Sequence, residues 1–254
     1  YILYFNSTWL NESDIYRMNA DGSNPINLTE NDFRDGVFGL SPDAKYIAFV
    51  SARRTPDDPN VYDNDIYTMD LDGLNVTRLT STTRNVGPPI WSPDGRHIGF
   101  VSAGDTLQAK DIYVMDTDGS NITQLTNIHG VQNFSWSHDS KKLAFSSTNQ
   151  KLYDGYIYSV DLNGENMTQL PGAPKGTYPA WSPDGAQLAF CSNDGIYIFN
   201  PDKGNVELLT SASYPSSLSW SPDGKLIIFT SGFAIFVMNA DGANKAQLTS
   251  LPSP

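Results

Sequence analysis

The sequence has few of the residues that build thiol and metal chemistry. Its single cysteine, Cys191, excludes a disulfide within the chain, and its place in the apolar run LAFCS predicts a small buried hydrophobic residue. The three histidines, His97, His129 and His138, are expected on a strand, a loop and a turn that lie on different faces. A shared zinc or manganese site is therefore not expected, and neither a metal nor a cofactor is predicted.

Basic residues and long apolar runs are also scarce. The chain carries 16 Lys and Arg against 28 Asp and Glu, a net charge of −12, and no basic stripe exists to meet phosphates, which disfavours nucleic-acid binding. The longest apolar stretch, at 227–238, is interrupted by polar residues and is too short to span a bilayer. No G-x-S-x-G sequence is present, so a serine hydrolase of the α/β type is not encoded. The chain starts at Tyr1 without methionine, which indicates a processed or excised piece of a longer protein.

What the chain has in abundance is repetition. The segment DIYVMDTDGSNITQLT (111–126) has copies of varying strength at 14–29, 65–80, 155–170, 195–210 and 234–249. A second segment, WSPDG followed by an apolar run, alternates with it, and its serine falls at 41, 92, 137, 182 and 221, at intervals of 51, 45, 45 and 39 residues. Repeats of roughly 40–50 residues made of short strands are typical of propeller blades.

Each repeat reads as four antiparallel strands, which we name a to d. Strand a ends in Trp-Ser, Ser-Pro-Asp-Gly turns the chain into strand b, and an Asp-Gly turn joins strand c to strand d, because glycine supplies the positive φ of tight hairpins. No sustained 3.6-residue period occurs, so very little helix is expected. One such sheet cannot bury both faces, whereas six packed radially can. The seams between blades are predicted to be filled by Leu40, Trp91, Trp136, Trp181 and Trp220.

The pattern WSPDG…IAF…DIYVMNADGSN…LT resembles the TolB-type propeller repeat, a WD40-like family, over essentially residues 1–250. The resemblance implies an all-β, six-bladed β-propeller of four-stranded antiparallel blades, in a single domain at 1–254. The blades are expected at 1–29, 36–80, 87–126, 131–170, 177–210 and 217–249. The resemblance says little about function, because such propellers serve binding, scaffolding and catalysis alike.

The first blade is predicted to be incomplete. Six c–d hairpins are present but only five Ser-Pro-Asp or Ser-His-Asp turns follow a strand a. Residues 1–7 (YILYFNS) align with strand b at 45–51, so this blade lacks its own strand a. We expect three strands in this blade, with at most a stub from the C-terminal residues 250–254 beside them.

Strand order predicts that one face carries the variable loops. The a–b and c–d turns share one side and are uniform, whereas the b–c loops at 7–13, 52–64, 103–110 and 148–155 vary in length and composition. Because binding sites favour variable loops on a rigid scaffold, a ligand site is assigned to the b–c/d–a face, with a bias towards the first four blades. The candidates are Trp9, Arg34, Arg53, Arg54, Tyr62, Arg84, His129, Tyr178 and Tyr214.

Each of these candidates has an alternative explanation that the sequence leaves open. Trp9 could fold back over the rim of the first blade, and the charges around Arg53 and Arg54 could be solvated. The d–a loop residues could converge on an anionic ligand or line a hydrated central channel. The turns of type Asp-x-Asp-Gly-x-Asn look like the start of a calcium loop, but no bidentate glutamate follows at the required spacing.

Seven N-x-S/T sequons give a hint about location. They are Asn6, Asn11, Asn27, Asn75, Asn121, Asn133 and Asn166. Three of them share one repeat position, so either the repeat consensus or an exported, glycosylated protein explains them.

The leading prediction is a non-catalytic, extracytoplasmic binding or scaffold propeller, in the periplasm, at the cell surface or secreted. Its expected partner is a protein or a glycan, with self-association or flanking domains of the same parent protein as further partners. The rival is an enzyme, either a polysaccharide lyase or hydrolase at the channel mouth, or the gating domain of a peptidase of the prolyl-oligopeptidase kind. A structural spacer that self-associates is a third class.

Overall fold

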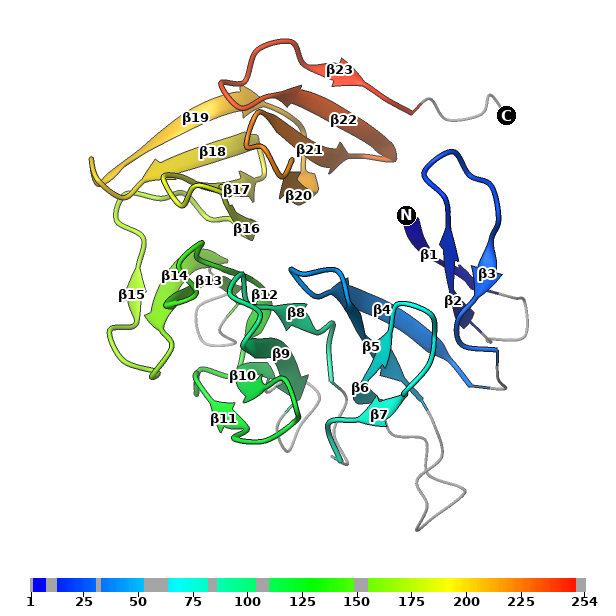
Figure 1. The fold of residues 1–254 in the computed structure, drawn as a ribbon. Coiled ribbons are helices and arrows are strands. Elements are labelled where there is room, and N and C mark those ends of the chain that lie inside the picture. The colour runs from blue at the N-terminus through cyan, green and yellow to red at the C-terminus, as the bar shows by residue number, and fades with distance from the viewer. Residues whose placement is uncertain are drawn as a thin grey trace. The chain divides into compact units, whose positions relative to one another are not determined.

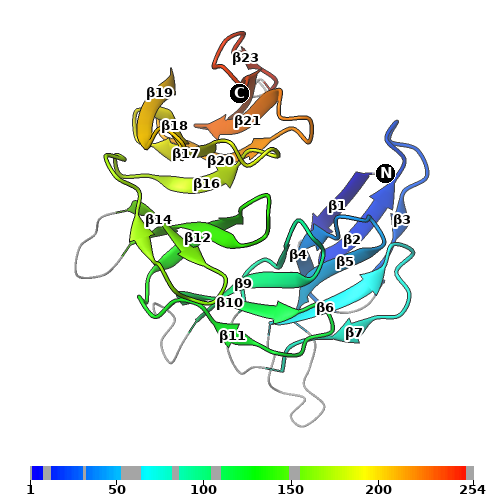
Figure 2. The ribbon, with the colours of Figure 1, turned by 60° about the vertical axis from the view of Figure 1, so that its left-hand side comes forward.

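The computed structural model describes residues 2–7, 13–30, 33–52, 64–81, 86–103, 110–148 and 155–249. Every regular element in these ranges is a β-strand, as predicted, and none is a helix. The chain divides into two compact units, Tyr1–Asn127 and Ile128–Pro254, each with three antiparallel sheets (Figures 1 and 2). Several residues with predicted roles lie outside the described residues, namely Trp9, Asn11, Arg53, Arg54, Tyr62, Arg84 and the tail at 250–254.

The first unit holds one three-stranded and two four-stranded sheets. The first comprises β1 (Ile2–Ser7), β2 (Ser13–Met18) and β3 (Ile26–Asn27). The second comprises β4 (Asp35–Leu40), β5 (Tyr46–Ser51), β6 (Asp65–Asp70) and β7 (Thr77–Arg78). The third comprises β8 (Ile90–Trp91), β9 (His97–Ala103), β10 (Lys110–Asp116) and β11 (Thr123–Gln124).

The second unit holds three four-stranded sheets. The fourth sheet comprises β12 (Val131–Trp136), β13 (Lys142–Ser147), β14 (Tyr156–Asp161) and β15 (Thr168–Gln169). The fifth comprises β16 (Thr177–Trp181), β17 (Leu188–Ser192), β18 (Gly195–Asn200) and β19 (Asn205–Ser211). The sixth comprises β20 (Pro215–Trp220), β21 (Leu226–Ser231), β22 (Ala234–Asn239) and β23 (Ala246–Gln247).

These six sheets confirm the predicted fold class, an all-β six-bladed β-propeller whose first blade has three strands. The predicted alignment of that blade is wrong by one residue. Tyr4 lies opposite Tyr16, as Phe49 lies opposite Tyr67, so Tyr4 corresponds to Phe49 and not to Ala48. The slip matters because a shift of one residue exchanges the two faces of a strand.

The a–b turn is built around one serine hydroxyl. Ser41 Oγ donates to Asp43 Oδ1 at 2.7 Å and accepts the amide of Tyr46 at 2.9 Å. These two bonds close the turn, because short polar side chains readily form hydrogen bonds with nearby side chains and with the backbone of their own turn. The serine–aspartate bond recurs at 2.6–2.7 Å in the other four turns of this type, Ser92–Asp94, Ser137–Asp139, Ser182–Asp184 and Ser221–Asp223.

The c–d turn packs tightly against the preceding blade. Gly73 has φ +78°, and a Cβ there would lie 2.8 Å from the carbonyl oxygen of Leu28 in the first blade. Gly119 has φ +86° and approaches the carbonyl oxygen of Leu79 in the same way, at 2.7 Å. Glycine is therefore required twice over, for its φ and for the close approach. These two c–d turns are thus held close to the end of strand d of the blade before them.

The core lies in the seams between neighbouring blades of each unit. Aromatic rings of strands b and c stack within every blade at centroid distances of 5.3–5.8 Å. Strand b places a fully buried aromatic next to the small Ala48 or Ala189, which leaves room for the following blade. Burial of this kind, at about 25 cal/mol per Å², is the main force holding the sheets together.

Three of the tryptophans at the end of strand a pack into these seams, a fourth is buried, and Leu40 is exposed. Trp91, Trp181 and Trp220 join the apolar clusters, and Trp136 is only 5% exposed. Leu40 is 43% exposed, so its predicted role is wrong. The indole of Trp91 reaches strand a of the preceding blade, and the first blade has no strand a against which Leu40 could pack.

Candidate functional site

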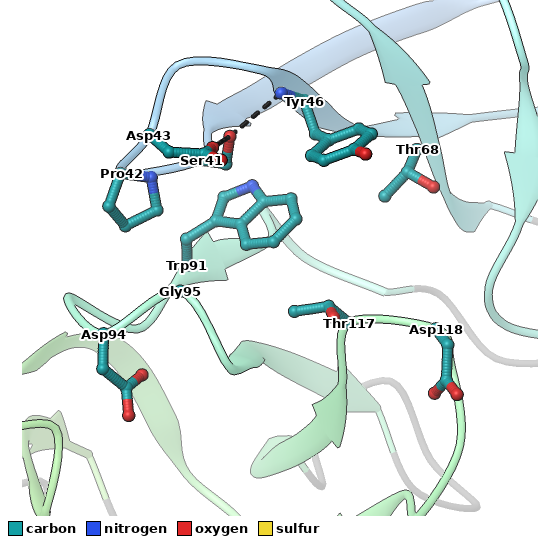
Figure 3. Close-up of a pocket in the computed structure, with 10 residues that line it drawn as sticks. All are labelled: Ser41, Pro42, Asp43, Tyr46, Thr68, Trp91, Asp94, Gly95, Thr117 and Asp118. Atoms are coloured by element: carbon teal, nitrogen blue, oxygen red, sulfur yellow. Dashed lines mark hydrogen bonds between the residues drawn. The ribbon is translucent and has the colours of Figure 1, made fainter.

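The first unit has a pocket in the seam between its second and third blades, on the side of the a–b and c–d turns. Its volume is about 420 Å³. We call it the Trp91 pocket. Figure 3 shows the Trp91 ring in the middle of the site, with Tyr46 and Thr68 on one side and Thr117 and Asp118 on the other. The remaining lining residues are Ser41, Pro42, Asp43, Asp94 and Gly95.

The aromatic surface of this pocket is fixed in place. Trp91 Nε1 donates a 3.0 Å hydrogen bond to the carbonyl oxygen of Gly39, which orients the indole and leaves a ring face beside the pocket. Tyr46, at the start of β5, is 46% exposed. An indole fixed in this way can pack against the aliphatic part of a ligand side chain. It can also attract a cation, because the face of the ring carries partial negative charge.

All ionisable groups that line the Trp91 pocket, apart from Tyr46, are carboxylates. Hydrogen bonds from the hydroxyls of Ser41 and Ser120 lower the pKa of Asp43 and of Asp118, respectively. Burial acts to raise the pKa of Asp94, but hydrogen bonds from Ser92 and the Arg96 amide outweigh it. The three carboxylates are therefore charged at neutral pH, and the pocket favours cations.

The second unit has the equivalent pocket between its fourth and fifth blades, with a volume of about 460 Å³. We call it the Trp181 pocket. Its charge differs, because His138 replaces Pro42 and Lys142 replaces Tyr46. The ammonium of Lys142 lies 3.2 Å from an Asp161 carboxylate oxygen. The other lining residues are Ser137, Asp139, Ser159, Leu170, Asp184, Gly185, Leu188, Phe199 and Pro201.

The two pocket tryptophans also differ in hydrogen bonding. The buried Nε1 of Trp181 has no hydrogen-bond acceptor among the described residues, whereas Trp91 and Trp220 each donate to a backbone carbonyl at 3.0 Å. Removing a buried donor from water without giving it an acceptor costs about 1–3 kcal/mol. The indole of Trp181 therefore lacks the hydrogen bond that orients the indole of Trp91.

The predicted site residues that the structure describes lie away from these pockets. His129, Tyr178 and Tyr214 come from the loops or first residues of strand a in the second unit, and all three have positive φ, at 55°, 53° and 47°. Tyr214 is 74% exposed, and its amide donates to the carbonyl oxygen of Asn193 at 2.9 Å. Arg34, in the first unit, is exposed, and its carbonyl accepts the amide of Ala52 at 3.0 Å. Their convergence on one ligand stays a prediction.

Sequence reasoning missed Phe233, which is 87% exposed. It stands in the two-residue turn between β21 and β22, where Ser231 pairs with Ala234 and Gly232 has φ +59°. A phenylalanine at the tip of a tight hairpin is unusual, because small and polar residues suit such positions best. That departure from turn chemistry was visible in the sequence.

The structure gives the repeated sequons a role that needs no glycan. Asn75, Asn121 and Asn166 have φ of 53–55° in the c–d turn. Each side-chain amide donates to the aspartate five residues earlier, at 2.6–2.7 Å. Asn24 and Asn244 have the same conformation without a sequon. Asparagine is thus favoured here as a left-handed turn residue. Asn6, Asn27 and Asn133 lie in strands β1, β3 and β12.

The described residues also bear on metal ligation and on the reactivity of the cysteine thiol. There, no group of three or more His, Cys, Asp or Glu could hold a metal ion. Burial raises the pKa of Cys191 to about 12, so its thiol is protonated at neutral pH. In the same residues, no helix is long and apolar enough to cross a membrane.

The repeated a–b–c–d sheets define the class of this protein as a six-bladed β-propeller. The model of the TolB beta propeller domain matches residues 89–253, more than half of the sequence, and the chain belongs to that family. It is 33% identical over 103 residues to an uncharacterized protein of Agrobacterium fabrum, a match that covers 39% of this chain and 35% of that protein.

Solved structures share the fold, and two of them serve as examples. TolB from Acinetobacter baumannii superposes with a TM-score of 0.72 at 23% identity, over 96% of this chain and 62% of that one. An oligogalacturonate lyase in complex with manganese gives a TM-score of 0.77 at 17% identity, over 97% of this chain and 73% of the lyase. At such identities the likeness concerns the fold alone. The chain spans about a third of its curated relative and less than two thirds of TolB.

Proposed function

We propose that this chain is a non-catalytic binding propeller that recognises a protein or a glycan through its b–c/d–a face. The observation that carries the proposal is a pair of exposed aromatic side chains, Tyr214 and Phe233, at that end of the sixth blade. Exposed aromatic residues on a rigid support are the usual anchors of protein interfaces and also stack on sugar rings.

Hydrogen bonding holds the segments that carry Tyr214 and Phe233 side by side in the sixth blade. Ser231 Oγ donates to the carbonyl oxygen of Ser213 at 2.7 Å, and Pro215 pairs with Ser231. Tyr214 therefore lies next to the strand whose hairpin tip carries Phe233. The positive φ of Tyr214 is kept by its bond to Asn193, so the ring is presented by a backbone that is already ordered.

The extracytoplasmic location, in the periplasm, at the surface or secreted, remains part of the proposal. It rests on the four sequons outside the repeated turn position, which are Asn6, Asn11, Asn27 and Asn133. Expression with and without its natural flanking sequence, followed by fractionation, tests this part. Recovery of the full-length protein in the cytosol would contradict it.

The binding proposal is tested with a displayed random-peptide library and a panel of defined oligosaccharides. Ligands selected on the natural chain are expected to lose about tenfold or more in affinity for the double variant Tyr214→Ala/Phe233→Ala, as anchor residues do. The matched control is Leu74→Ala, which removes another exposed apolar side chain, from a c–d turn. Ligands that bind the double variant as well as the natural chain overturn the site.

The enzymatic rival requires turnover. The natural chain is incubated with oligogalacturonides and with a peptide library, and products are followed by mass spectrometry. Binding without product formation supports the proposal. Product formation that disappears in His129→Ala would replace the proposal with the rival.

A further inference from the structure

A feature of the first blade indicates what the Trp91 pocket binds. Arg17, in strand c of that blade, reaches across the seam to the c–d turn of the second blade. Its guanidinium pairs with the Asp72 carboxylate and donates to the carbonyl oxygen of Leu71 at 2.9 Å. The Arg17 side chain is only 14% exposed, so this seam is filled by the protein's own arginine.

The next seam has the same acceptors without the arginine. In strand c of the second blade Thr68 stands where the first blade has Arg17, since Thr68 lies opposite Ala48 and Arg17 opposite Leu3. In the c–d turn of the third blade, Thr117 and Asp118 correspond to Leu71 and Asp72. All three residues line the Trp91 pocket. The pocket is therefore the space that an arginine side chain occupies one seam earlier.

The carboxylate of Asp118 is available for such a partner. Its Oδ1 accepts hydrogen bonds from the amide and the hydroxyl of Ser120, at 2.9 and 2.6 Å. Its Oδ2 accepts none from the described residues. Asp94 adds negative charge to the same pocket and Trp91 supplies a ring face, whereas the Asp43 carboxylate is paired with the Lys45 ammonium at 3.1 Å.

We propose that the Trp91 pocket is a binding site for an arginine side chain carried by a protein partner. The guanidinium donates to Asp118 and to the carbonyl oxygen of Thr117, as Arg17 does to Asp72 and Leu71, while its stem packs on Trp91. Arginine suits the site better than lysine, because its planar fork donates to a carboxylate and a carbonyl together and stacks on an indole. This site lies beside the a–b and c–d turns of the first unit, whereas Tyr214 belongs to the second unit, and it goes beyond the proposed function.

The probe is N-acetyl-arginine amide, with the lysine and citrulline analogues alongside. Saturable binding of the arginine probe is expected with a Kd on the order of 1 mM, which is typical of a single polar fragment. The readout is the chemical shift of the Trp91 indole N–H. The lysine probe is expected to bind several-fold more weakly and the neutral citrulline probe to bind least. Equal binding of arginine and citrulline overturns the proposal, as does no saturation by arginine.

Two variants locate the site. Asp118→Asn is expected to weaken arginine binding about tenfold, because a charge-assisted bond is lost. Thr68→Arg places the protein's own guanidinium in the pocket and is expected to abolish binding. Asp72→Asn and Ser159→Arg, the equivalent changes elsewhere, are expected to leave it unchanged. Thermal unfolding checks that each variant folds, and arginine affinity that survives in folded Asp118→Asn and Thr68→Arg alike overturns the assignment.

The two proposals are separable in the same experiment. Tyr214→Ala/Phe233→Ala is expected to bind the arginine probe normally, and Asp118→Asn is expected to bind ligands selected for the b–c/d–a face normally. Loss of arginine binding in the double aromatic variant would contradict an independent site in the Trp91 pocket.

Discussion

The Trp91 and Trp181 pockets are the same architectural feature with different chemistry. Each pocket lies between two neighbouring blades and contains the tryptophan at the end of a strand a. Each is also lined by an a–b turn in which a serine hydroxyl donates a hydrogen bond to an aspartate. Yet the first is lined by three aspartates, and the second contains Lys142 and His138. The repeat thus keeps the backbone framework of each pocket the same, and a few side chains that line the pocket decide which ligand it can bind.

The largest effect is expected where the two seams are alike. Phe100→Ala and Phe190→Ala each remove a fully buried ring and are expected to cost about 3–5 kcal/mol of unfolding free energy. Urea denaturation followed by intrinsic fluorescence measures both. A cost below 1 kcal/mol for one variant only would show that the seams are not equivalent in their cores.

A tenfold effect is expected where the pockets differ in charge. Tyr46→Lys gives the Trp91 pocket the ammonium that Lys142 provides in the Trp181 pocket, and repulsion is expected to weaken binding of the arginine probe about tenfold. Calorimetric titration or indole chemical shifts measure the change. The reciprocal Lys142→Tyr serves as control and is expected to leave arginine affinity at the Trp91 pocket unchanged. If Tyr46→Lys and the natural chain bind the arginine probe with equal affinity, the charge of the pocket does not control binding.

A smaller effect is expected from the two indole N–H groups. Trp91→Phe loses the hydrogen bond to the Gly39 carbonyl, whereas Trp181→Phe removes a donor that has no acceptor among the described residues. The first substitution is therefore expected to cost about 1 kcal/mol more unfolding free energy than the second. Denaturation curves of the two variants and of Trp220→Phe, which should behave like Trp91→Phe, provide the test. A larger cost for Trp181→Phe would contradict the hydrogen-bond assignment.

The smallest effect is expected from pH. Hydrogen bonds from serine hydroxyls lower the pKa of Asp43 and Asp118 in the folded protein. A group with a lowered folded pKa stabilises the fold fully above its unfolded value, near 3.9, and this stabilisation is lost as the pH falls through the folded value. Stability and arginine affinity are therefore expected to be constant from pH 7 to about 4.5 and to decline only below about 4. A decline that begins near pH 6 would contradict this.

The fold was predictable because each turn and strand pattern, weak on its own, recurs several times along the chain. Five turns of the type Ser-x-Asp at spacings of 39 to 51 residues leave few alternatives to blades. Two details failed for reasons of packing. The strand at Ile2–Ser7 aligned one residue off, because YILYF has apolar residues on both faces. Leu40 is exposed because the first blade has no strand a against which it could pack. Its position in the repeat alone does not show that this partner strand is missing.

The candidate site was less predictable, for a related reason. The a–b/c–d side looked uniform, so variable loops drew attention to the other side. The informative signal was a single column of the repeat, in which strand c carries Arg17, Thr68 and Ser159 at equivalent positions. Reading the repeats position by position would have exposed that difference. Whether the carboxylate across the seam is within reach depends on the close approach of Gly73 and Gly119 to the preceding blade, which only coordinates reveal.

The account rests on the claim that one strand-c residue decides whether a seam is filled or open. A crystal structure of Thr68→Arg tests it most directly. We predict that the introduced guanidinium lies within hydrogen-bond distance of the Asp118 carboxylate and the Thr117 carbonyl oxygen, as Arg17 lies beside Asp72 and Leu71. A guanidinium that points into solvent, with the Trp91 pocket unchanged, would contradict the claim.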